Sequence, residues 1–229
     1  MGRGLIDQNT VSAENQVKQS KRAYYLGNPT ASKKILIVGN SITWHEPCAE
    51  VGWYGNCGMS ASATEKDYVH LLFEMLKKDK QDVFIRVSQC AEWERTFFKD
   101  EDILSKYDED REFDADLVIF RLGENVAVAD MSYFDKPFRQ FVRHICPRGK
   151  MLFTTCFWEN PALDPLIKAF AKERGEACVD CCFSKDEKNM ALGLFQHKGV
   201  ALHPGDLGMA RIAKAIFAAL QENKAPGVR

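Results

Sequence analysis

Three short polar segments carry the residue types that acyl transfer requires: Gly39-Asn40-Ser41, Gly123-Glu124-Asn125 and His203-Pro204. A serine hydroxyl attacks a carbonyl when a neighbouring base takes its proton, and histidine is such a base near neutral pH. An asparagine amide, together with backbone N–H groups, can stabilise the oxyanion that then forms. This pattern predicts Ser41 as nucleophile, His203 as base, and the Ser41 N–H with the Asn125 side chain as oxyanion donors.

The elements around these segments predict how they meet. Apolar runs indicate five strands, and amphipathic stretches between them indicate helices. Strands that alternate with helices favour a mostly parallel sheet with helices on both faces. Because the carboxyl ends of parallel strands share one edge, the three segments can converge there. The expected strands are residues 34–38, 83–87, 117–120, 151–155 and 177–182.

The length of 229 residues suits one α/β domain. We expect residues 34–229 to form it and residues 1–33 to be a polar N-terminal arm, with Tyr24, Tyr25 and Leu26 docking on the body. The arm has no apolar core of the kind a secretory signal needs, which predicts a cytoplasmic protein.

Charge and composition exclude several partner classes. The net charge of −1 offers no basic excess for binding nucleic acid. No apolar run approaches the ~20 residues that span a membrane. The expected partner is therefore a small molecule, and the oligomeric state stays open.

The eight cysteines are expected to be free thiols, because a chain of this length without a signal seldom relies on disulfides. Cys178 and Cys181 have the C-x-x-C spacing, but a zinc site would need a second ligand pair. Their apolar surroundings indicate a buried strand instead. We therefore expect no metal and no cofactor.

The segment from Trp44 to Ala63 is long and weakly periodic, and it directly follows the candidate nucleophile. Loops of this length are often functional. We expect it to form a pocket wall in which Trp44, Trp53 and Tyr54 contact the substrate, since such rings suit an apolar or sugar face. The alternative is a surface excursion whose aromatic residues pin it to the core.

The three segments together resemble the SGNH (GDSL-like) hydrolase family. Gly39-Asn40-Ser41 is similar to its first block, Gly123-Glu124-Asn125 to its Gly-x-Asn block, and His203 with its neighbours to its last block, in the family's order. The resemblance covers residues 34–222. It implies a three-layer α/β/α, flavodoxin-like fold with a five-stranded parallel sheet, and hydrolysis of a carboxylic ester, such as an acetyl group on a sugar.

The sequence departs from the family pattern in three places. Asn40 stands where the family usually has Asp, and residues 88–94 lack the glycine whose N–H completes the oxyanion hole. Val200 stands where the Asp that orients the histidine is usual. We therefore predict a Ser41–His203 dyad, with the imidazole held by a backbone carbonyl near Val200 or by a distant carboxylate.

Other functions stay open. The same dyad could serve a lipid esterase or a thioesterase, and the missing Asp and glycine could mark a binding module that has lost catalysis. A flavodoxin-like nucleotide binder is disfavoured, because no glycine-rich phosphate loop follows the first strand.

Overall fold

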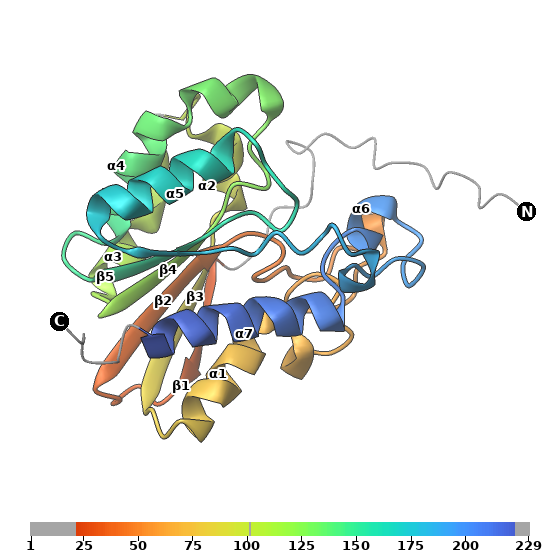
Figure 1. Ribbon diagram of the computed structural model, residues 1–229, viewed down its shortest axis with the longest axis horizontal. Helices are drawn as coiled ribbons and strands as arrows, with labels where there is room; N and C mark the ends of the chain where they lie inside the picture. Colours follow the sequence, from red (N-terminus) through yellow and green to blue (C-terminus); the bar gives the residue numbers. More distant parts are fainter. Residues whose placement is uncertain (1–21, 101, 223–229) are drawn as a thin grey trace, which may run out of the picture.

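The computed structural model describes residues 22–100 and 102–222. Its core is one six-stranded sheet in the order β1-β3-β2-β4-β5-β6 (Figure 1). The strands from β2 to β6 run parallel to one another. The five strands predicted from the sequence are therefore present, but the last one ends at Val179, so Cys181 lies outside the strand that was predicted to reach residue 182. Their bounds are β2 Lys33–Gly39, β3 Val83–Gln89, β4 Leu117–Arg121, β5 Lys150–Thr154 and β6 Ala177–Val179.

The sixth strand comes from the segment that the sequence assigned to an arm. Residues Ala23–Gly27 form β1, which pairs antiparallel with β3 at the edge of the sheet. The segment carries aromatic residues with high strand propensity, and β3 offers it an unpaired edge. Residues 23–27 of the expected arm thus join the sheet, while residues 1–21 lie outside the described residues.

Helices cover both faces of the sheet, which gives three layers (Figure 1). Alternate residues of β2 enter two separate apolar clusters: Ile35 and Ile37 join the cluster under α1 and α7, and Leu36 and Val38 join the cluster under α4 and α5. A strand buried on both faces is mostly apolar, as residues 35–38 of β2 are. The helices are α1 Tyr68–Lys78, α2 Ala91–Thr96, α3 Asp108–Glu112, α4 Asp135–Ile145, α5 Leu163–Arg174, α6 Lys198–Ala201 and α7 Asp206–Glu222.

The chain between β2 and α1 is an ordered loop held by isolated bridges between His45 and Cys57 and between Cys48 and Trp53. It ends in a short 3-10 turn, and α1 follows with Asp67 as its N-cap; the Asp67 carboxylate accepts from the His70 N–H at 2.8 Å. Such a side-chain cap satisfies a helix N–H that has no partner inside the helix.

Within residues 22–100 and 102–222, no helix combines the length and the apolar character that crossing a bilayer requires.

Candidate active site

Ser41 and His203 meet although 162 positions separate them in the sequence. The Ser41 Oγ lies 2.8 Å from the His203 Nε2, within hydrogen-bond distance. Ser41 follows β2 directly, and His203 lies between α6 and α7. Both residues keep some exposed surface.

A tight turn places Ser41 at the carboxyl edge of the sheet. The Thr43 and Trp44 N–H groups both donate to the Asn40 carbonyl, at 2.8 and 3.0 Å. Gly39 makes this possible, because a Cβ there would lie 1.9 Å from the Thr43 Oγ1. Glycine is therefore required at the start of the Gly-Asn-Ser segment, because the chain approaches itself too closely there to leave room for a Cβ.

The His203 ring is oriented by a backbone carbonyl. Its Nδ1 lies 2.7 Å from the Gly199 oxygen, so Nδ1 carries the hydrogen and Nε2 faces Ser41 as acceptor. Burial lowers the pKa of His203 to about 4, which keeps the imidazole neutral at neutral pH. The Gly199 carbonyl lies next to Val200, as one of the two predicted arrangements requires.

The loop before α7 is fastened to the β2–α1 loop. Ser60 donates to the Val200 carbonyl at 2.6 Å and is itself buried with a left-handed φ of 77°. Asp206 accepts from the Ser62 N–H at 2.8 Å and from the Ser62 hydroxyl at 2.7 Å. The Asp206 carboxylate therefore joins the start of α7 to the β2–α1 loop.

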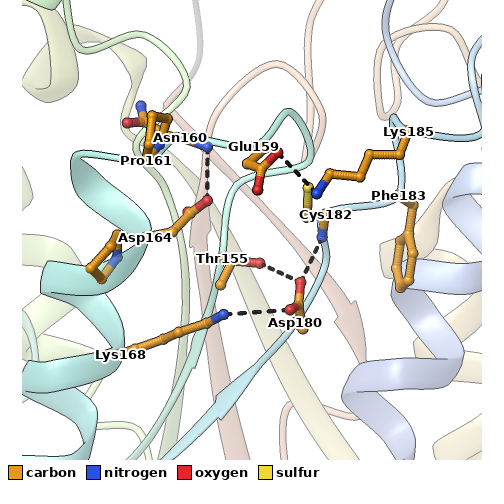
Figure 2. A pocket seen from close by; sticks show the side chains of 11 residues that line it. Thr155, Glu159, Asn160, Pro161, Asp164, Lys168, Asp180, Cys182, Phe183 and Lys185 are labelled. Atoms are coloured by element: carbon orange, nitrogen blue, oxygen red, sulfur yellow. Dashed lines mark hydrogen bonds and ion pairs between the residues drawn. The ribbon is translucent and has the colours of Figure 1, made fainter.

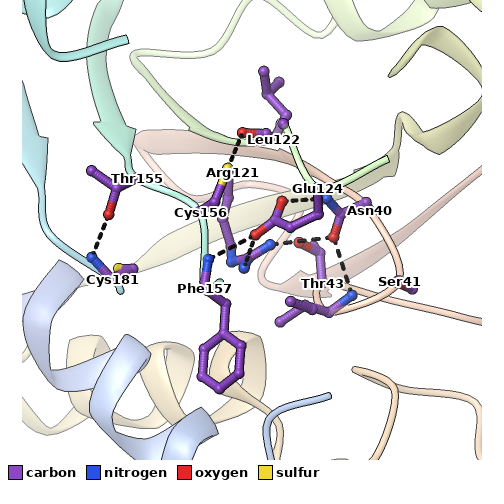
Figure 3. A network of polar contacts seen from close by, with 12 residues as sticks. Asn40, Ser41, Thr43, Arg121, Leu122, Glu124, Thr155, Cys156, Phe157 and Cys181 are labelled. Atoms are coloured by element: carbon purple, nitrogen blue, oxygen red, sulfur yellow. Dashed lines mark hydrogen bonds and ion pairs between the residues drawn. The ribbon is translucent and has the colours of Figure 1, made fainter. Parts of the chain in front are cut away.

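A buried polar network lies beneath Ser41 (Figure 3). Arg121 at the end of β4 donates to the Asn40 Oδ1 at 3.2 Å and to Glu124 at 2.5 Å. The Asn40 Nδ2 donates to Glu124 at 2.6 Å. Although burial opposes ionisation, Arg121 holds the pKa of Glu124 below its ordinary value. The side-chain amide of Asn40, the residue before Ser41, is thus hydrogen-bonded at both its oxygen and its nitrogen.

A second buried carboxylate, Glu94 on α2, extends this network. It accepts from Asn40 at 3.1 Å, from Asn125 at 2.5 Å and from the Gly123 N–H. Burial and the charge of Glu124 raise the pKa of Glu94 to about 7.

Gly123 allows the turn that brings the Asn125 amide to Glu94. Its φ is +126°, and a Cβ there would lie 2.8 Å from the Cys156 Sγ. The Gly-Glu-Asn segment therefore reaches the same network as Asn40.

The predicted oxyanion donors have different surroundings. Within the described part of the chain, the Ser41 N–H has no hydrogen-bond acceptor. The Asn125 Nδ2 donates to Glu94, and its Oδ1 accepts from the Arg95 Nη2 at 3.1 Å. In residues 88–94, which lack the family's glycine, the Cys90 N–H donates to the Gly39 carbonyl and the Ala91 N–H donates to the Gln89 side chain.

The three aromatic residues predicted to contact substrate differ in exposure. Trp44 and Trp53 are each 3% exposed, and their indole N–H groups bond Asn56 and the His45 carbonyl. They belong to the core of the loop. Tyr54 is 75% exposed, so of the three it alone presents its ring to solvent. The sequence missed Trp158, whose ring stands edge-on to the His203 ring at 5.2 Å.

A cavity of about 430 Å³ lies at the carboxyl ends of β5 and β6, between α5 and residues 182–185 (Figure 2). It includes neither Ser41 nor His203. Its charged groups pair with one another, Lys168 with Asp180 at 3.4 Å and Lys185 with Glu159 at 2.9 Å.

Metal-binding clusters of three or more His, Cys, Asp or Glu residues are absent from the residues that the structure describes. The eight cysteines all lie within those residues and are free thiols. Of the C-x-x-C pair, Cys181 is fully buried and Cys178 lies in β6.

No protein-family model matches the sequence, and no curated protein sequence matches it. Solved structures do. An acetylxylan esterase from Geobacillus stearothermophilus superposes with a TM-score of 0.55 at 17% identity, over 83% of this chain and 94% of that one. A family two carbohydrate esterase from Cellvibrio japonicus gives 0.55 at 16% identity, over 84% of this chain and 61% of the other. A protein of the G-D-S-L family from Desulfitobacterium hafniense gives 0.50 at 17% identity, over 82% and 99%.

The chain has the SGNH/GDSL hydrolase fold. The structural matches and the six-stranded α/β sheet agree with the fold class that the three polar segments predicted. Because the sequence identities to these structures are 16–17%, the matches show a shared fold and do not show a shared function.

Proposed function

We propose that the protein is a serine esterase that hydrolyses a small carboxylic ester through Ser41 and His203. The observation that carries the proposal is the chain of contacts from the Ser41 Oγ to the His203 Nε2 and from the His203 Nδ1 to the Gly199 carbonyl. These contacts supply a nucleophile, a neutral base and a group that fixes the tautomer of the base.

The reaction follows from these contacts. His203 takes the proton of Ser41 while the oxygen attacks the ester carbonyl, and the imidazolium then protonates the leaving alcohol. Water attacks the resulting acyl-enzyme by the reverse route, with His203 again as base. The Ser41 N–H and the Asn125 Nδ2 are the proposed donors to the oxyanion of each tetrahedral intermediate. No step needs a metal or a cofactor.

The absent aspartate is compatible with this role. An uncharged carbonyl orients the imidazole but stabilises the imidazolium less than a carboxylate does. We therefore expect slower turnover than a Ser-His-Asp triad would give on the same fold, but not inactivity.

An acetyl group on a sugar is the proposed natural ester. The support is that the fold matches include an acetylxylan esterase and a carbohydrate esterase. The exposed Tyr54 ring and the Trp158 ring beside His203 are surfaces of the kind that pack against sugars. Comparing acetylated oligosaccharides with longer-chain esters and thioesters separates this proposal from a lipid esterase or a thioesterase.

The first test is hydrolysis of p-nitrophenyl acetate by the wild type, Ser41→Ala and Ser105→Ala. Ser105 is a matched control, because its hydroxyl only bonds the Asp102 carbonyl at an exposed site. We expect turnover by the wild type and by Ser105→Ala, and loss of turnover in a folded Ser41→Ala. Equal rates for all three proteins would refute the serine mechanism, and an inert wild type would favour the binding-module alternative.

A further inference from the structure

Glu94 is a buried carboxylate that the reaction above does not use. It lies on α2, its residue is 0% exposed, and its two oxygens accept from three donors. Two of those donors belong to the Gly-Glu-Asn segment, namely the Gly123 N–H and the Asn125 Nδ2. A buried carboxylate that serves only the fold would be costly, so its position beside a proposed oxyanion donor calls for a function.

The Asn125 amide is held between an acceptor and a donor, both on α2. Its Nδ2 faces the Glu94 carboxyl group at 2.5 Å, and its Oδ1 faces the Arg95 guanidinium at 3.1 Å. The Glu94 oxygens accept from three N–H groups, and a guanidinium only donates hydrogen bonds. A rotated amide would set oxygen against oxygen and N–H against N–H, so these two partners fix which end of Asn125 carries the donor.

We propose that Glu94 is the positioning residue of the oxyanion hole, holding the Asn125 amide so that Nδ2 is presented as a donor. This inference rests on the proposed esterase function. The Nδ2 group has two hydrogens. One bonds Glu94, and the other is left to donate to the oxyanion as it forms. Glu94 acts through Asn125 and does not touch the substrate.

The helix that carries Glu94 is rigidly anchored. Trp93, its neighbour, is 1% exposed and stacks on Phe141 with ring centroids 4.2 Å apart. The ring fixes α2 against the layer formed by α4, and the next two residues then reach Asn125. Residues 88–94 lack the glycine N–H that related proteins are expected to use. On this proposal they contribute an orienting carboxylate in its place.

The kinetic test compares Glu94→Gln with Glu92→Gln in the assay on p-nitrophenyl acetate. Glu92 lies on the same helix, but its carboxylate is 45% exposed and pairs with Arg22 and Lys106. We expect Glu94→Gln to lower kcat by about 10–100-fold with little change in KM, as loss of an orienting partner does, and Glu92→Gln to leave both unchanged. Should Glu94→Gln fail to fold, Glu94→Asp retains the charge and is expected to lower kcat in the same way, because its shorter side chain draws the amide out of place.

A double-mutant cycle distinguishes positioning from general support of the fold. Asn125→Ala alone should cost about 10²–10³-fold in kcat, the usual loss of one oxyanion donor. If Glu94 acts through Asn125, adding Glu94→Gln to that variant costs almost nothing more. Additive losses would overturn the proposal.

A spectroscopic readout decides the proposal without reference to activity. The Asn125 side-chain amide signals in a ¹⁵N–¹H spectrum are identified by their absence in Asn125→Asp. We expect Glu94→Gln to shift them and Glu92→Gln to leave them in place. Unmoved signals in Glu94→Gln would overturn the positioning role even in an active enzyme. If the wild type proves inert while the signals shift, the esterase function fails and the contact stands.

Discussion

Replacing Asn40 with Asp tests the amide that this chain has at the position where the SGNH pattern it resembles usually has Asp. The Asn40 Nδ2 lies 2.6 Å from the Glu124 Oε2 and 3.1 Å from the Glu94 Oε1, and all three side chains are buried. Asn40→Asp would remove the donor and place a third carboxyl group against two others. We expect it to destabilise the protein strongly at alkaline pH and weakly at acidic pH.

The size of the effect follows from the distances. Two negative charges about 3 Å apart repel by about 5 kcal/mol at an effective dielectric constant of about 20. The new Asp can avoid this by keeping a proton. From a reference pKa of about 3.9 and about 1.36 kcal/mol per unit, that costs about 5.6 kcal/mol at about pH 8 and about 1.5 kcal/mol at about pH 5. The cost of about 5.6 kcal/mol at about pH 8 is comparable to the whole free energy of unfolding of an ordinary domain, about 5–15 kcal/mol.

The sign is set by linkage. A carboxyl group whose pKa is raised on folding stabilises the folded state fully below its unfolded pKa, and that contribution disappears as the pH rises through the folded pKa. The penalty of Asn40→Asp should therefore grow by about 4 kcal/mol between about pH 5 and about pH 8.

The assay is urea unfolding of the wild type and Asn40→Asp at both pH values. Asn28→Asp is the matched control, since the Asn28 Nδ2 also faces a carboxylate, Asp82 at 3.3 Å, but in an exposed setting. Its cost should stay below about 1 kcal/mol because solvent screens the charges. A penalty for Asn40→Asp that is equal at the two pH values, or that stays below about 1 kcal/mol at the higher one, would refute the reasoning.

Three further predictions concern the groups around the dyad. The first is measured in Glu94→Gln, so that the titration of Glu94 does not overlap with that of His203. In this variant kcat/KM for p-nitrophenyl acetate should fall as the pH drops through about 4, because the base must be neutral and burial lowers the pKa of His203 to about 4. A midpoint above about 6 would contradict the burial of the imidazole. Gly123→Ala should lower the free energy of unfolding, measured by thermal unfolding, by more than about 2 kcal/mol, since φ of Gly123 is +126° and a Cβ would crowd a buried thiol. Gly175→Ala should lower it by about 1 kcal/mol, since φ of Gly175 is +69° and the space around it is open. Equal losses would show that the structure accommodates the Cβ at Gly123. Ser60→Ala removes the 2.6 Å bond to the loop that carries the histidine, so we expect a loss of about 1 kcal/mol in stability together with a lower kcat, and an unchanged kcat would disprove its part in placing the imidazole.

The strands and the three polar segments could be predicted from the sequence. The strand 34–38 is apolar from Ile35 to Val38 because both of its faces are buried there, and a run of this kind needs no distant information to be recognised. The turn at Gly39 also follows from local chemistry, since Asn and Ser after a glycine favour tight backbone. The edge strand β1 escaped prediction because its pairing is set by the free edge of β3, not by its own pattern.

The tertiary structure alone decided which groups form the hydrogen-bond network of the site. The sequence marks Glu94 only as one acidic residue of the segment 88–94, and Arg121 only as the residue after the apolar strand 117–120. Their burial and their bonds to Asn40 and Asn125 arise because the carboxyl ends of β2 and β4 meet beside the start of α2. The sequence left open whether a backbone carbonyl near Val200 or a distant carboxylate holds the imidazole, and the packing of the chain placed the Gly199 carbonyl there. The residue types thus determined which chemistry is available, and the packing of distant segments determined which groups hold it in place.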